Sequence, residues 1–178
     1  FKNFFKINDG FIKLYLALKF SKKVNFLDEF NHSLNSILLP NDLQEKKYIC
    51  VHFRQGDYLK VASLLPNLDD LLNCASNFAS ICQNIIILSD DNLDPNITIR
   101  LKEYGFKDIK LISAGEPITA HLIMVFSSIL ICSNSQFSLS AGLLNKNIVI
   151  IPKRWYAQLK LKIIEILIEE FSSKYIVF

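Results

Sequence analysis

After residue 47, apolar residues occur in five short, continuous runs that polar or amphipathic segments separate. The runs are rich in Ile, Leu and Val, a composition typical of β-strands. A strand that is apolar along its whole length is buried on both faces, as in a parallel sheet covered by helices on both sides. The predicted strands cover residues 48–53, 84–89, 109–112, 129–132 and 147–152.

The segments between these runs have the pattern of helices. Asp69 and Asp70 stand in the first turn of the first such segment, where negative charge is favourable. Gly105 follows the second segment, at a position typical of a helix C-cap. Strands that alternate with helices predict an α/β fold, a parallel sheet with helices on both faces. The predicted helices cover residues 68–82, 95–104, 117–128, 138–144 and 160–170.

The first 47 residues have a different pattern from the rest. They read as helical and amphipathic, with Phe11, Leu14 and Leu18 on one side and lysines elsewhere. We therefore divide the chain into a helical lead-in or inter-domain region, residues 1–47, and one α/β domain, residues 48–178. The chain begins without Met, so we expect it to be part of a longer protein. The lysines would suit peripheral contact with an anionic membrane surface, but a solvated helix face has the same pattern.

Composition and charge exclude several classes of protein. Of the 178 residues, 51% are hydrophobic and 21% charged, which is globular and not disordered. The net charge of +3 is far below that of a dedicated nucleic-acid binder, although it would favour an anionic ligand. No stretch reaches the ~18 uninterrupted apolar residues of a membrane span, and no signal peptide is recognisable.

The cysteines indicate neither a disulfide framework nor a metal site. The four of them lack Cys-x-x-Cys spacing and a His partner at ligand spacing. Cys50 and Cys132 lie inside predicted strands, where a buried free thiol is the ordinary interpretation. Free thiols fit a reducing cytoplasm, so we expect a cytoplasmic protein without a bound metal.

The polar residues that follow the predicted strands are the candidates for function, because parallel sheets bind ligands beyond the carboxyl ends of their strands. The first such segment is His-Phe-Arg-Gln-Gly-Asp-Tyr at residues 52–58. Arg54 offers a planar fork that suits a pyrophosphate, and Gly56 lets the backbone approach a ligand closely. The alternative is a surface Arg54 paired with Asp57 beside an ordinary turn.

A second candidate is Cys-Ser-Asn-Ser-Gln-Phe-Ser at residues 132–138, which follows a strand and opens a helix. Backbone N–H groups at a helix start and the hydroxyls of Ser135 and Ser138 would form an anion site. The alternative is that these serines only cap the helix, but four polar residues after a buried strand exceed what capping needs.

A third candidate, Ser89-Asp90-Asp91, lies at the end of the second predicted strand and is less specific. These carboxylates could bind a metal, a ribose or a guanine edge, or they could cap the next segment. A metal is not favoured, because no Gly-rich phosphate loop and no matching His lie nearby in the sequence. His121 lies in an apolar helical stretch, and a packed core His explains it better than a catalytic one.

Taken in order, these motifs resemble the bacterial α-1,2-fucosyltransferase family, which builds surface glycans. The family pattern is His-x-Arg-Arg-Gly-Asp-Tyr after a strand, Ser-Asp-Asp after a second strand, Asn-Ser-x-Phe-Ser at a helix start, and Pro-Lys-x-Trp. The resemblance covers about residues 48–158. The matching segments are residues 52–58, 89–91, 134–138 and 152–155.

The resemblance implies the C-terminal, Rossmann-like half of a two-domain GT-B-like glycosyltransferase. It also implies a metal-independent, inverting transfer of fucose from GDP-fucose to a glycan acceptor, such as a galactoside 2-hydroxyl in O-antigen synthesis. No other cofactor and no nucleic acid partner are implied.

Roles follow where the motifs match. Arg54 would neutralise the pyrophosphate, and Asn134, Ser135 and Ser138 would face the phosphates and the fucose. Ser89, Asp90 and Asp91 would lie near the nucleoside. His52 and Asp57 would hold the Arg, and either could approach the acceptor hydroxyl as a base. The candidate catalytic residues are therefore His52, Arg54 and Asp57.

This chain departs from the family pattern at several positions. Gln55 stands where the family usually has a second Arg, and Leu139 and Ser140 replace a usual pair of Trp residues. The N-terminal Gly-Gly-x-Gly-Asn-Gln segment of the family is absent. Two alternatives therefore remain open: a glycosyltransferase of the same architecture with another nucleotide-sugar donor, and a non-catalytic domain that binds a GDP-sugar.

Overall fold

The computed structural model describes most of the predicted α/β domain. The predicted helical region 1–47 lies almost entirely outside the described residues, and the predicted helix 160–170 lies outside them as well. The described residues are 43, 46–56, 67–113, 116–152 and 175–177.

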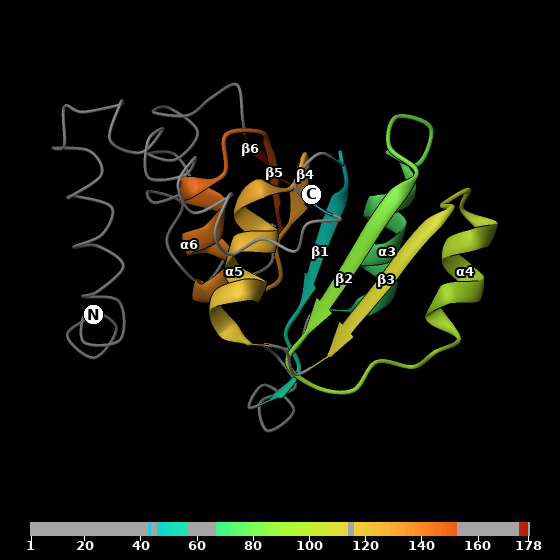
Figure 1. Cartoon of the computed structure of the whole chain (residues 1–178), viewed down its shortest axis with the longest axis horizontal. Helices are drawn as coiled ribbons and strands as arrows, with labels where there is room; N and C mark the ends of the chain where they lie inside the picture. The colour runs from blue at the N-terminus through green and yellow to red at the C-terminus, as the bar shows by residue number, and fades with distance from the viewer. Residues whose placement is uncertain (1–42, 44–45, 57–66, 114–115, 153–174, 178) are drawn as a thin grey trace, which may run out of the picture.

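The described part of the chain forms one six-stranded sheet in which all strand pairs are parallel. The strands are β1 (Ile49–Phe53), β2 (Asn84–Ser89), β3 (Asp108–Ser113), β4 (Ile129–Ile131), β5 (Ile148–Ile151) and β6 (Tyr175–Val177). Their order in the sheet is β3-β2-β1-β4-β5-β6, which is that of the Rossmann fold. Figure 1 shows β1, β2 and β3 running in the same direction, toward one edge of the sheet.

Four helices connect the strands in the described residues, and local signals fix their ends. Asn67 caps the first helix by accepting a hydrogen bond from the backbone N–H of Asp69. Pro117 stands in the first turn of the third, where a missing N–H costs nothing. Gly105, just after the second, adopts a φ of 97°. The helices are α3 (Leu68–Ser76), α4 (Ile97–Glu103), α5 (Pro117–Phe126) and α6 (Gln136–Leu144).

The sheet has an apolar core on each face, because successive residues of a strand point to opposite sides. On one face, Cys50 and Leu130 pack with residues of α5 and α6. On the other face, Val51, Ile87 and Ile131 pack with residues of α3 and α4. Figure 1 shows the two helix pairs on opposite sides of the strands. The sheet is thus the middle of three layers, and its strands can be apolar throughout.

The predicted α/β fold, a parallel sheet with helices on both faces, is confirmed. The first predicted helix is shorter than expected, ending at Ser76, and Asn77 donates side-chain hydrogen bonds to the carbonyls of Asn73 and Cys74. Strand β6 was not predicted. Among the described residues, no helix combines the length and the apolar character that crossing a bilayer requires.

The side chain of Asn145 forms hydrogen bonds to two helix–strand connections at the amino-terminal edge of the sheet. Its side chain is fully buried, and its Nδ2 donates to the carbonyl oxygens of Met124 and Ser127, each at 2.9 Å. Its Oδ1 accepts from the backbone N–H of Asn147 at 2.6 Å. One side chain therefore joins the α5–β4 connection to the α6–β5 connection.

We expect Asn145→Ala to lower the free energy of unfolding by about 2 kcal/mol, because two buried carbonyls and a backbone N–H each lose a hydrogen bond. Asn77→Ala is the matched control, since its amide also bonds backbone carbonyls but is exposed. The control should change stability by less than about 0.5 kcal/mol. Urea unfolding of both variants measures the difference, and equal losses would contradict the assignment.

Candidate functional site

The order of the strands reverses beside β1. The chain passes from β1 to β2 and β3 on one side, and then returns to β4 on the other side of β1. Phe53 pairs with Ser89, and Val51 pairs with Ile131. The residues that follow β1 therefore lie between those that follow β2 and those that follow β4. In open parallel sheets this reversal point, at the carboxyl ends of the strands, is where ligands bind.

A buried hydrogen bond joins the ends of β1 and β4. Nδ1 of His52 lies 2.8 Å from Oγ of Ser133. His52 is 4% exposed, and Ser133 is fully buried. This bond fixes the floor of the site, because each residue belongs to one of the two strand ends that meet there.

His52 is held in the neutral form. Burial is the main cause that lowers its pKa to about 3, and the positive charge of Arg54 and the neighbouring His121 contribute to the same shift. The ring of Phe137 lies near both histidine rings, with centroid distances of 5.8 Å to His52 and 5.2 Å to His121. His121 also bonds Ser140 at 3.0 Å, in accord with a packed histidine. A neutral, hydrogen-bonded His52 is suited to holding the floor of the site.

Arg54 directly follows β1, and its guanidinium forms an ion pair across the edge. Nη1 of Arg54 lies 2.8 Å from Oδ2 of Asp90, which follows β2. The side chains are 30% and 22% exposed. Oδ1 of Asp90 accepts the backbone N–H of Gln55 at 2.7 Å. Arg54 is therefore placed at the edge by a carboxylate of the neighbouring strand, on the β2 side of β1.

The turn after β1 passes close to this carboxylate. Gly56 has a φ of 22°, and a Cβ at this position would collide with Oδ2 of Asp90. Only glycine allows this approach without displacing the ion pair. Gly56 therefore allows the turn to pack closely against Asp90.

The start of α6 lies at the end of β4 and supplies the other side of the site. Ser135 is the N-cap, and its Oγ accepts the backbone N–H of Phe137 at 3.2 Å. Ser138 is fully buried and donates to the carbonyl oxygens of Ser133 and Ser135. Both hydroxyls thus bond groups of the helix start itself. What this segment offers a ligand is the positive end of the helix dipole and its first-turn N–H groups.

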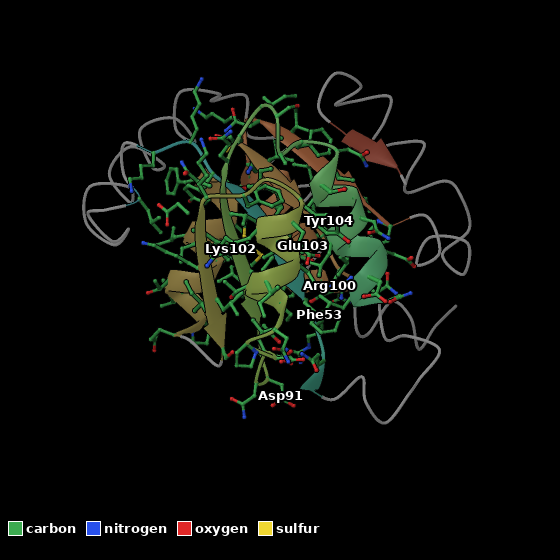
Figure 2. All side chains as sticks on the ribbon, turned by 90° about the vertical axis from the view of Figure 1, so that its right-hand side faces the viewer. Phe53, Asp91, Arg100, Lys102, Glu103 and Tyr104 are labelled. Carbon is green, nitrogen blue, oxygen red and sulfur yellow. The ribbon has the colours of Figure 1, made fainter. Side chains whose placement is uncertain are left out.

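The remaining polar residues lie on the β2 side. Oγ of Ser89 accepts from Nε2 of Gln55 and from the backbone N–H of Asp91, both at 3.2 Å. Asp91 is partly exposed, and its Oδ1 accepts the backbone N–H of Asn92. Figure 2 shows Asp91 beyond Phe53 at this end of the molecule. Gln55 thus interacts with the end of β2.

The structure places eight of the predicted site residues along the carboxyl edge. His52 lies near the end of β1, and Arg54 directly follows the strand. Asn134, which is 5% exposed, lies with the two serines after β4. Asp57 and the predicted Lys-x-Trp segment lie outside the described residues. Ser133 and Phe137 were not among the predicted site residues. The signal for Ser133 was its place directly after the predicted strand 129–132.

No model of a known protein family matches this chain, and no curated protein matches it either. Within the described ranges, no group of three or more His, Cys, Asp or Glu residues is arranged to hold a metal ion. In the part of the chain that the structure describes, the guanidinium of Arg54 and the amino-terminal end of α6 bring positive charge to this edge. Together they flank the end of β1.

Proposed function

We propose that this chain contains the donor site of a glycosyltransferase that transfers fucose from GDP-fucose to a sugar hydroxyl with inversion. The observation that carries the proposal is the placement of Arg54 and the amino-terminal end of α6 on either side of the end of β1, at the point where the strand order reverses. The proposal draws the identity of the donor from the resemblance of the four sequence motifs to α-1,2-fucosyltransferases.

Three features of this edge favour a nucleoside diphosphate. The reversal point of a parallel sheet is the usual place for nucleotides. A helix start attracts phosphate through its dipole and its N–H groups. A guanidinium binds phosphate oxygens with two parallel hydrogen bonds, which an ammonium group cannot do. In this proposal the diphosphate lies across the end of β1, between Arg54 and α6.

The proposed reaction is a single displacement. The oxygen of the acceptor hydroxyl attacks the anomeric carbon of fucose, the bond from that carbon to the phosphate oxygen breaks, and GDP leaves with the electron pair. Arg54 and the start of α6 stabilise the charge that develops on the departing phosphate. A base takes the proton of the hydroxyl, and Asp57 is the candidate from the sequence motif. His52 holds the floor of the site in its neutral form.

A panel of ligands tests the proposal on the 178-residue chain. At a concentration 100-fold above its Kd, a ligand adds about 2.7 kcal/mol to stability, which raises the Tm by about 5 °C or more in a domain of this size. We expect this shift with GDP-fucose and GDP, and a smaller one with UDP-sugars. A chain that responds to none of them at millimolar concentration does not have the proposed site.

The panel also separates the two alternatives. A larger shift with GDP-mannose or a UDP-sugar would assign another donor to the same architecture. A non-catalytic binding domain is favoured by Gln55, because this residue bonds Ser89 where the family usually has a second cation. Binding of GDP-fucose without release of GDP in the presence of galactoside acceptors would support that alternative.

A further inference from the structure

Asp90 was predicted to face the nucleoside, but its carboxylate is engaged by the protein. Each of its oxygens accepts one strong hydrogen bond: Oδ2 from Nη1 of Arg54 at 2.8 Å, and Oδ1 from the backbone N–H of Gln55 at 2.7 Å. Both donors belong to the turn that follows β1. Asp90 therefore binds that turn at two successive residues.

The packing of the turn supports the same interpretation. Gly56 passes so close to Oδ2 of Asp90 that a Cβ would collide with it. Three successive residues, 54–56, are thus fitted around one carboxylate, the first through its side chain and the other two through their main chain. A carboxylate held by two bonds and covered by the turn is a fixed group and not a mobile surface charge.

This arrangement determines where the guanidinium of Arg54 lies. An unanchored Arg side chain has many rotamers, and ordering it for a ligand costs conformational entropy. The ion pair with Asp90 engages Nη1, and a guanidinium has five N–H donors in a planar fork. One edge of the fork can therefore be anchored while another is directed at a ligand.

We propose that Asp90 is a positioning residue, which holds Arg54 ready to bind the diphosphate and does not contact the nucleotide itself. This inference rests on the proposed function, because it assigns Asp90 a role in binding at the same site. Asp90 also repels an incoming diphosphate, and the proposal states that the loss of positioning outweighs the relief of that repulsion.

The test is a double-mutant cycle measured by calorimetric titration of GDP into the 178-residue chain. We expect Asp90→Asn to weaken GDP binding about tenfold, because the neutral amide no longer anchors the guanidinium. In an Arg54→Ala background the same substitution should weaken binding less than twofold, because there is no guanidinium left to position. A role in stability alone would not produce this dependence on Arg54.

Asp69→Asn is the matched control. Asp69 forms an Arg–Asp pair of similar length with Arg100, at 2.7 Å, but on the surface between α3 and α4. In Figure 2, Arg100 lies on α4, away from the end of the molecule where Asp91 lies. The control removes the same charge and the same kind of ion pair, so it should leave the Kd for GDP within twofold.

Each outcome of these titrations supports or overturns either the positioning role of Asp90 or the proposed function. Tighter or unchanged binding by Asp90→Asn overturns the positioning role, and so does an equal loss in the presence and absence of Arg54. A wild-type chain that does not bind GDP overturns the proposed function instead. Should Asp90→Asn fail to fold, Asp90→Glu serves in its place: it keeps the charge but moves the carboxylate by one methylene, and we expect weaker GDP binding from it too.

Discussion

Arg54→Ala is expected to reduce transfer of fucose from GDP-fucose by at least 100-fold in kcat/KM, or about 3 kcal/mol of transition-state stabilisation. The loss is comparable to that of one oxyanion-binding group in other enzymes, since charge builds on the leaving phosphate as the bond to fucose breaks. Release of GDP in the presence of a panel of galactosides measures the rate. Calorimetric titration of GDP measures the accompanying loss of affinity.

Two further variants show whether this effect belongs to Arg54 itself. Arg54→Lys keeps a cation beside Asp90 but loses the planar fork, so its activity should lie between those of wild type and Arg54→Ala. Arg100→Ala removes an exposed guanidinium that also pairs with an aspartate, and it should retain activity within twofold. Near-normal transfer by Arg54→Ala would mean that another group binds the phosphates.

The second large effect is a loss of stability in acid that His52 causes. The pKa of His52 is lowered to about 3 in the folded chain, whereas an unfolded His titrates near 6.5. Between these values the unfolded state binds a proton that the folded state does not, so stability falls as the pH falls. The contribution is absent above about pH 6.5 and grows by about 1.4 kcal/mol for each pH unit below it.

Urea unfolding of wild type and of His52→Asn, each at pH 7.0 and pH 4.5, isolates the contribution of His52 to the free energy of unfolding. Asn keeps a hydrogen-bonding atom near the position of Nδ1 but does not titrate, so the variant should lose about 2.7 kcal/mol less than wild type between the two pH values. The other titratable groups are the same in both proteins, and among them burial lowers the pKa of His121. Equal losses would show that His52 is protonated in the folded chain.

The sheet was predictable because its strands are buried on both faces. Residues 84–89 were predicted as a strand from their apolar run alone, and β2 has the same bounds. The helix ends were less predictable, since α3 ends where the amide of Asn77 bonds two carbonyls of its own helix. Strand β6, Tyr175–Val177, is too short to have a pattern, and only its pairing with β5 makes it a strand.

The location of the candidate site was predictable, but its contacts were not. Polar residues after β1, β2 and β4 lie at one edge because parallel strands end there together. The partner of Arg54 could not be predicted, because Asp57 and Asp90 are equally plausible in sequence and only the strand register brings Asp90 beside the turn. Likewise, the bonds of Ser138 to two carbonyls depend on how β4 leads into α6.

Strand β3 is the outermost strand on its side of the described sheet, and all six of its residues are partly exposed. An outer strand presents unpaired main-chain groups to which another polypeptide could add, the first step of aggregation. Two features of β3 oppose such an addition. Its sequence includes the charged residues Asp108 and Lys110, and Lys46 forms an ion pair with Asp108 at 3.2 Å. A polypeptide that joined this edge would have to approach those charges, which helps to keep the α/β domain from assembling edge to edge.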